Sequence, residues 1–141
     1  YTPISLLQYI NTLSNYGNRY ALRFKKEDYN TFLNQIELDT SFYDRIMEGL
    51  YEVFHGGTAS SYVNKSKNAV GKTGTSETFY DSDSDGVVDK EVINSTVAFY
   101  YPRETPRYSM VVVAPFLTDN GDFMYPFTKN VSLHMTNYLP L

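Results

Sequence analysis

The sequence of 141 residues contains no cysteine. This absence excludes a disulfide scaffold, thiolate metal sites and a cysteine nucleophile. No apolar run approaches the roughly 18 to 20 residues that a bilayer-spanning helix needs, so we expect no membrane span. The chain starts at Tyr1 with neither an initiator methionine nor a signal-like apolar segment. We therefore expect it to be a piece of a longer protein.

Basic residues are in the minority. Lysine and arginine number 12 against 16 aspartates and glutamates, a formal net charge of -4, which argues against a nucleic-acid partner. The acidity is concentrated between Glu77 and Glu91, where six acids accompany one lysine. The chain is nevertheless 42% hydrophobic, with 14 tyrosines and 9 phenylalanines. That content excludes a wholly disordered chain, and the length suits one domain or a large part of one.

Two helices are expected in the first half of the chain. Thr2 followed by Pro3 is typical of a helix start, and apolar residues then recur at helical spacing up to Asn15, before Gly17. The segment 39–57 predicts a second helix, which begins with an Asp-Thr cap and ends at a Gly-Gly pair. The predicted apolar face of this second helix consists of Phe42, Ile46, Leu50, Val53 and Phe54.

Between these helices, 20–24 predicts a short strand and 25–38 predicts no clear element. In the second half, the segments 69–75, 92–101 and 108–116 predict strands, and 126–138 predicts a closing helix. The apolar run 110–113 predicts a strand covered on both faces, whereas the polar segment 76–90 predicts a loop. This order of elements indicates an α+β fold with an antiparallel sheet packed by helices.

A Gly-Lys-Thr-Gly string at 71–74 is the strongest chemical signal. A phosphate-binding loop would need a glycine five residues before the Gly-Lys pair and a helix directly after it. This chain has Ser66 at the first position and a polar segment after the string, so nucleotide binding is disfavoured. The string is also typical of the Lys-Thr-Gly edge strand of penicillin-recognising transpeptidases.

The residue types suit such a strand. Lys72 would be a fixed cation beside a serine active site, where it would attract a substrate carboxylate and favour ionised partner groups for proton transfer. Gly74 lacks a side chain, so a peptide could lie against the strand as an added strand. Thr73 and Thr75 would offer hydroxyls to a carboxylate, and the Thr75 backbone N–H would donate to a developing oxyanion. Lys72 and Thr75 are therefore the candidate catalytic residues, and all four are candidate substrate-binding residues.

Three further blocks surround this strand. They are the Thr-Pro helix ending at Asn15-Tyr16-Gly17-Asn18, the helix followed by Gly56-Gly57-Thr58-Ala59, and the two later strands with their proline-bounded connection at 102–106. In order and spacing they resemble the segments around the Lys-Thr-Gly strand of penicillin-binding proteins. The string Lys-Thr-Gly-Thr-Ser-Glu at 72–77 is most similar to the class B, monofunctional type.

This resemblance implies the C-terminal portion of a class B D,D-transpeptidase domain, in the penicillin-recognising serine transpeptidase and β-lactamase-like fold. Such an enzyme serves cell-wall synthesis by cross-linking peptidoglycan stem peptides through serine acyl transfer, and it is acylated by β-lactam antibiotics. The resemblance also implies a parent protein that is anchored in the bacterial membrane, with this domain on the extracytoplasmic face.

The chain departs from the family pattern in one respect. It contains no Ser-x-x-Lys nucleophile motif, and its Ser-x-Asn match at 66–68 stands directly before the Lys-Thr-Gly strand, where we interpret it as chance. We therefore expect residues 1–141 to be a partial transpeptidase domain that lacks the upstream Ser-x-x-Lys and Ser-x-Asn segments and is inactive alone. We also expect its sheet to be covered by the upstream half of the same domain or by another chain.

Carboxylates alternate at Asp81, Asp83 and Asp85, followed by Gly86 and Asp89. This spacing resembles a calcium loop, although the twelfth position is valine instead of glutamate and no flanking helices are expected. We expect no cofactor and interpret the segment as a solvated, mobile loop, with calcium bound by these four aspartates as the alternative.

Two other functions remain open from the sequence. A β-lactam-hydrolysing or β-lactam-sensing relative would share the Lys-Thr-Gly strand, although the Thr-Pro helix and the Gly-Gly-Thr-Ala block weigh against it. A non-catalytic, calcium-stabilised extracellular binding module would carry the same string incidentally.

Calcium titration separates the enzyme from the binding module. We expect millimolar calcium to leave the melting temperature unchanged, because a solvated loop needs no ion. A cation at 100 times its Kd would stabilise the fold by about 2.7 kcal/mol. A large upward shift, together with unchanged β-lactam acylation of a Lys72→Ala variant of the complete protein, would instead favour the module.

Overall fold

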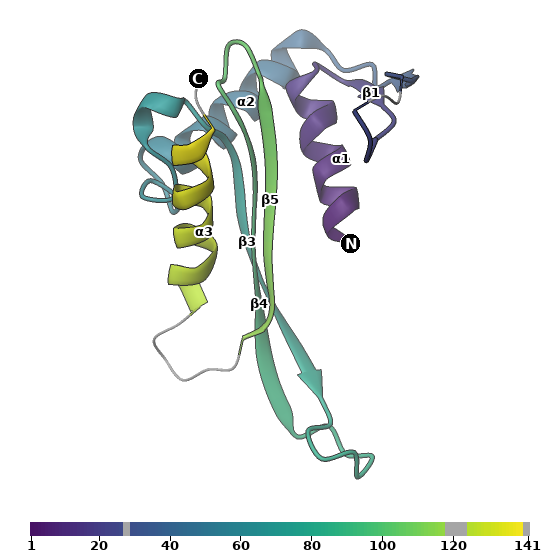
Figure 1. Ribbon diagram of the computed structural model, residues 1–141, viewed down its shortest axis with the longest axis vertical. Helices are drawn as coiled ribbons and strands as arrows, with labels where there is room; N and C mark the ends of the chain where they lie inside the picture. Colours follow the sequence, from purple (N-terminus) through teal and green to yellow (C-terminus); the bar gives the residue numbers. More distant parts are fainter. Residues whose placement is uncertain (27–28, 118–123, 140–141) are drawn as a thin grey trace.

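The computed structural model describes residues 1–26, 29–117 and 124–139 (Figure 1). In chain order the elements are helix α1 (Pro3–Ser14), strands β1 (Asn18–Tyr20) and β2 (Phe32–Gln35), helix α2 (Thr40–His55), the 3-10 turn η1 (Lys65–Lys67), strands β3 (Val70–Tyr80), β4 (Lys90–Tyr101) and β5 (Tyr108–Leu117), and helix α3 (Met124–Tyr138). None of the helices in these ranges is both long and apolar enough to cross a membrane.

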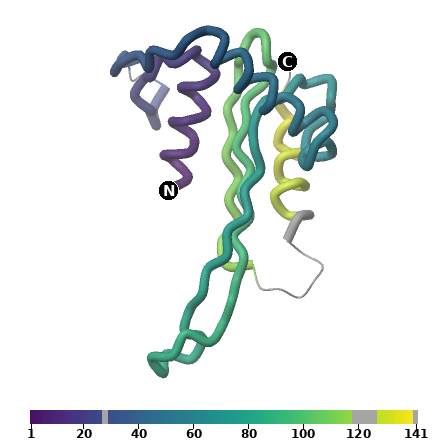
Figure 2. The backbone as a smooth tube through the Cα atoms, turned by 180° about the vertical axis from the view of Figure 1, so that it is seen from behind, coloured from purple at the N-terminus to yellow at the C-terminus, as the bar shows by residue number. Residues whose placement is uncertain are grey.

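Strands β3, β4 and β5 form one antiparallel sheet in that order. Helix α1 lies on one face of the sheet and α3 on the other (Figure 1). The arm formed by β3 and β4 extends well beyond the helices and carries the acidic segment at its tip, which is also plain from behind (Figure 2). The expected α+β arrangement, with three adjacent antiparallel strands packed by the last helix, is therefore present.

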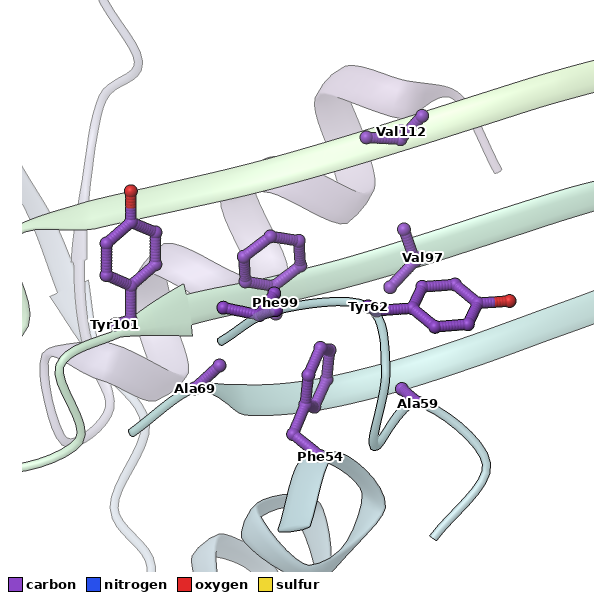
Figure 3. Close-up of a cluster of buried hydrophobic side chains, with 9 residues drawn as sticks. Phe54, Ala59, Tyr62, Ala69, Val97, Phe99, Tyr101 and Val112 are labelled. Carbon is purple, nitrogen blue, oxygen red and sulfur yellow. The ribbon is translucent and has the colours of Figure 1, made fainter. Parts of the chain in front are cut away.

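Strand β4 holds the fold together because both of its faces are buried. Consecutive side chains in a strand point to opposite faces. Val97, Phe99 and Tyr101 accordingly lie in a core with Phe54 of α2 on the α3 side of the sheet (Figure 3). Ala98 and Tyr100 lie in a second core on the α1 side, together with Ile10, Leu13, Tyr43, Met47 and Val70.

Helix α1 begins and ends as predicted. The Thr2 hydroxyl accepts a hydrogen bond from the Ser5 N–H at 3.3 Å, which satisfies one of the free donors of the first turn. After the helix, Gly17 has a φ of +85°, and a Cβ there would lie 2.5 Å from the Ile36 carbonyl oxygen. Glycine is required at this turn both for its backbone conformation and for the close approach of the chain at Ile36.

Helix α2 starts at the predicted cap, and its predicted apolar face is confirmed at Leu50, Val53 and Phe54, which pack in the two cores, but is wrong at Phe42 and Ile46. The Asp39 carboxylate accepts bonds from the Ser41 hydroxyl and N–H, at 2.6 and 2.8 Å, and these bonds lower the pKa of Asp39. Phe42 and Ile46 are 64% and 38% exposed, whereas Tyr43 and Met47, one position later, are 4% and 6% exposed. The buried tyrosine is tolerated because its hydroxyl donates to the Thr12 carbonyl at 3.2 Å.

The strand predicted at 20–24 is also misplaced. The structure forms β1 earlier, at Asn18–Tyr20, and pairs it with β2, which the sequence did not predict. All four β2 residues are exposed, so no alternation of apolar and polar residues marks this strand. Residues 27–28, within the segment 25–38, lie outside the described residues.

The loop predicted at 76–90 is shorter than expected. Strand β3 continues to Tyr80 and β4 already begins at Lys90, which leaves 81–89 as the connection. The outer parts of both strands are rich in polar, exposed residues. Their extended conformation follows from unbroken pairing, Ser76 with Asn94 and Tyr80 with Lys90, and not from burial.

The closing helix α3 is confirmed, and it faces the sheet with small hydroxyl side chains. Thr128, Ser132 and Thr136 recur every four residues and are fully buried. The Ser132 and Thr136 hydroxyls donate to carbonyls four residues earlier, at 2.7 and 2.8 Å. Thr128 meets Ser95 of β4 at 3.1 Å. The three buried hydroxyls of α3 therefore all have partners.

Alkaline pH tests the burial of Tyr100. Burial raises the pKa of its hydroxyl from 10.0 to about 12. The folded state thus holds the proton more tightly, so this stability is fully present below about pH 10 and is lost as the pH rises toward about 12. We expect the free energy of unfolding of the complete protein to fall over this interval, and to fall less steeply in a Tyr100→Phe variant. An identical pH dependence in the two proteins would contradict the assignment.

Candidate active site

The Lys-Thr-Gly segment lies on strand β3, at the edge of the sheet in the part of the chain that the structure describes. It is extended, as predicted, and is paired with β4 without a bulge. Lys72 is opposite Ala98, and Gly74 is opposite Thr96. One edge of this segment is therefore fixed by β4 and the other carries no strand of the described chain.

The backbone direction along β3 follows from two contacts farther out. The Ser76 carbonyl accepts a bond from the Asn94 side chain at 3.5 Å, and the Tyr80 carbonyl accepts one from the Asp89 N–H at 3.3 Å. Even-numbered residues therefore direct their peptide groups toward β4. Because successive residues of a strand alternate, the N–H and C=O groups of Thr73 and Thr75 point to the open edge.

The Lys72 side chain extends over the sheet face that carries α1, beside a cavity. Its ammonium donates to the Thr73 carbonyl at 2.9 Å. The cavity has a volume of about 290 Å³ and is lined by residues of α1 (Leu6, Tyr9, Ile10), α2 (Leu50), β3 (Lys72, Thr73, Gly74) and β4 (Thr96, Ala98). Apart from Lys72 its walls bear no charged side chain, so the cation stands against a largely apolar surface.

The Thr73 side chain leaves the strand on the opposite face. Its hydroxyl lies 3.3 Å from that of Thr58, in the turn that follows α2. The contact joins the Gly-Gly-Thr-Ala block to the Lys-Thr-Gly strand. Sequence reasoning treated Thr58 only as part of a motif, and nothing in the sequence indicates the contact because 14 residues separate the two threonines. Thr75 is exposed on the same strand.

The two glycines of the string differ in how much space the surrounding chain leaves for a side chain. A Cβ on Gly71 would clash with the Ala98 carbonyl oxygen and with the Phe99 Cα and Cβ. A Cβ on Gly74 would meet only the Thr96 Cβ, at an ordinary 3.9 Å. Folding of the described chain therefore requires glycine at position 71 but not at position 74.

The acidic segment lies at the tip of the β3–β4 arm (Figure 1). It follows the end of β3 at Tyr80, whereas Lys72 lies near the start of that strand. Asp81, Asp83 and Asp85 each offer a carboxylate oxygen within 4.8 Å of the others. Asp89, the fourth predicted ligand, instead accepts bonds from the Ser82 hydroxyl and N–H, at 2.7 and 2.8 Å, and these bonds lower its pKa. The Gly86 N–H donates to Asp81 at 2.7 Å and lowers the Asp81 pKa. The N–H and hydroxyl groups of the loop thus supply part of the hydrogen bonding of these carboxylates. Calcium binding by the four aspartates stays a prediction.

The Ser-x-Asn match at 66–68 lies in and just after η1 and serves local structure. Ser66 donates to the Asn64 side chain from both its N–H and its hydroxyl, at 3.0 Å. Lys67 donates to the Leu139 carbonyl at 2.9 Å and so ties this turn to the segment that follows α3.

The comparisons with known proteins agree with this geometry. Residues 1–126 match the family model described as the penicillin binding protein transpeptidase domain. The chain is 27% identical to penicillin-binding protein 2A of Bacillus subtilis, over 93% of this chain and 21% of the relative. It is 30% identical to penicillin-binding protein H of the same organism, over 85% and 19%. The solved structure of penicillin-binding protein 2B from Streptococcus pneumoniae R6 superposes with a TM-score of 0.77 at 24% identity, over all of this chain and 25% of that one.

The chain belongs to the penicillin-binding protein transpeptidase family. The more specific prediction, the C-terminal portion of a class B transpeptidase domain, is confirmed as well. The chain spans about a fifth of the length of the curated relatives that it matches.

The two glycines yield a stability test. Gly71→Ala overpacks the contact with β4, so we expect it to lower the free energy of unfolding of the complete protein by about 1–3 kcal/mol. Gly74→Ala enters open space and should change it by less than about 0.5 kcal/mol. Chemical denaturation of both variants checks this difference. Equal losses would show that position 74 is also packed by the protein itself.

Proposed function

We propose that this chain forms one wall of the active site of a peptidoglycan D,D-transpeptidase, which cross-links stem peptides by serine acyl transfer and is acylated by β-lactams. Gly74 is the observation that carries the proposal. It is a position without a side chain on β3, two residues after Lys72, and the open edge of this strand carries no other strand of the described residues. The chain's own packing does not need a glycine there. A requirement for glycine there would come from a ligand that lies against the strand.

The open edge of β3 suits a peptide substrate. Thr73 and Thr75 present outward N–H and C=O groups, which can pair with an extended stem peptide as an added strand. The Thr75 N–H is the proposed oxyanion donor, and the Thr73 and Thr75 hydroxyls are the proposed partners of the substrate carboxylate. Backbone pairing of this kind holds the scissile bond in register with the edge.

Lys72 supplies the positive charge. Its ammonium lies beside an apolar-walled cavity, and a charge acts more strongly on its neighbours at such a surface than in open water. We assign Lys72 the tasks of attracting the substrate carboxylate and of favouring the ionised form of the groups that move the serine proton. The cavity adjoins the strand on the α1 side, so a nucleophile held there would be within reach of Lys72.

The nucleophile belongs to another part of the protein. This sequence has no Ser-x-x-Lys, and we propose that the Ser-x-x-Lys and Ser-x-Asn segments lie in residues of the same domain beyond this chain, without which residues 1–141 are inactive. Cavities of about 720 and 480 Å³ run beside β5 and are lined by α1 and by the segment after β1. In the described residues β5 is the second edge strand of the sheet, and an unpaired edge strand invites association with another chain. We therefore propose that the upstream half of the domain covers this side of the sheet.

The proposed substrate fixes the compartment. Peptidoglycan stem peptides are cross-linked outside the cytoplasm, so the domain would work at the extracytoplasmic face of the bacterial membrane, anchored by another segment of the parent protein. The match to a transpeptidase family favours this function over a β-lactam-hydrolysing or β-lactam-sensing relative.

Acylation by a labelled penicillin tests the function in the complete protein. Lys72→Ala should lower the second-order acylation rate at least about 100-fold, because it removes the charge that supports proton transfer. Lys90→Ala removes an exposed lysine from the far end of the same sheet and is the matched control, with an unchanged rate expected. Gly74→Ala should also slow acylation while the protein remains folded. Normal acylation of Lys72→Ala would overturn the proposal.

A further inference from the structure

Thr58, which has no role in the function proposed above, contacts Thr73. The two hydroxyl oxygens are 3.3 Å apart, within hydrogen-bonding distance. Thr73 is half-buried beside the open edge of β3, and Thr58 is its hydroxyl partner in the described part of the chain. A hydroxyl has one proton to donate and can accept as well, so a neighbour that donates to Thr73 leaves the Thr73 proton available.

The turn that carries Thr58 is fixed on both sides. Before it, the N–H groups of Gly56 and Gly57 both donate to the Glu52 carbonyl, at 3.0 and 2.8 Å. After it, the Ala59 N–H donates to the Val53 carbonyl at 2.9 Å, and Ala59 is fully buried in the core on the α3 side (Figure 3). The position of the Thr58 side chain is thus set by helix α2 and by the core.

Gly57 makes this close turn possible. A Cβ at Gly57 would lie 3.0 Å from the Glu52 carbonyl oxygen and from the Val53 Cα, tighter than ordinary packing allows. The glycines of the Gly-Gly-Thr-Ala block therefore bring the chain tightly around the end of α2, and the threonine that follows them reaches β3.

We propose that Thr58 is a positioning residue for the transpeptidase reaction. Its hydroxyl donates to Thr73 Oγ1, selects one side-chain rotamer of Thr73, and leaves the Thr73 proton directed at the carboxylate of the substrate or β-lactam. A β-branched side chain has few rotamers, so a single fixed partner is enough to hold Thr73 in one of them. This inference rests on the proposed function, and Thr58 itself contacts no reacting atom.

A double-mutant cycle in the complete protein tests the inference, with the acylation rate by a carboxylate-bearing penicillin as readout. Thr58→Val keeps the shape and removes the hydroxyl, and should slow acylation about fivefold, as expected for one neutral hydrogen bond. Thr58→Ser keeps the hydroxyl and should acylate at the rate of the parent protein. In a Thr73→Val background, Thr58→Val should have no further effect, because its action passes through Thr73.

Two controls separate positioning from a purely structural role. Thr78→Val removes another hydroxyl of β3, one that accepts from Asn94 at 2.7 Å, and should leave acylation unchanged. With a penicillin whose carboxylate is esterified, Thr58→Val should acylate at the rate of the parent protein, because no carboxylate is there to be bound. Additive effects of Thr58→Val and Thr73→Val, or an equal loss with the esterified penicillin, would overturn the inference. If Lys72→Ala abolishes acylation while Thr58→Val has no effect, only the role of Thr58 fails.

Discussion

The pairing of β3 with β4 is the constraint on which the rest of the structure depends. Strand β4 is buried on both faces, between a core that includes Phe99 and one that includes Tyr100, so it cannot shift without breaking both. Its unbroken register with β3 fixes which peptide groups turn inward and which turn outward. The open edge at Thr73 and Thr75 is therefore set by a core that lies well behind it.

In this arrangement the groups of the proposed site leave β3 on its two faces and along its open edge. Lys72 extends toward the cavity on the α1 side, Thr73 toward Thr58 on the other face, and the intervening backbone toward the open edge. Because successive side chains of a strand point to opposite faces, the Lys72 charge, the Thr73 hydroxyl and the peptide groups of the edge are separated in space within three residues. The Lys72 ammonium donates to the Thr73 carbonyl beside a cavity lined by α1, the Thr73 hydroxyl meets the turn after α2, and the backbone pairs with β4, so the proposed substrate groove involves all three elements.

Much of this followed from the sequence, because strong local signals agree with the tertiary structure. The Thr2 cap, the proline-bounded connection between β4 and β5, and the Lys-Thr-Gly string all keep their expected places. The errors arise where local composition is a poor guide. Buried Tyr43 depends on a hydrogen bond to α1, β2 is exposed throughout, and the outer part of β3 is a strand only because β4 pairs with it. The Thr58–Thr73 contact is long-range and leaves no trace in either segment alone.

A structure of the complete protein acylated by a β-lactam tests the central claim most directly. The proposed account predicts a ligand that lies along the open edge of β3, with the carbonyl oxygen of the acyl group about 2.7–3.1 Å from the Thr75 backbone nitrogen. Its carboxylate should lie beside the Thr73 hydroxyl and the Lys72 ammonium. A ligand bound away from β3, or a strand of the parent protein paired with that edge in place of the ligand, would contradict the account.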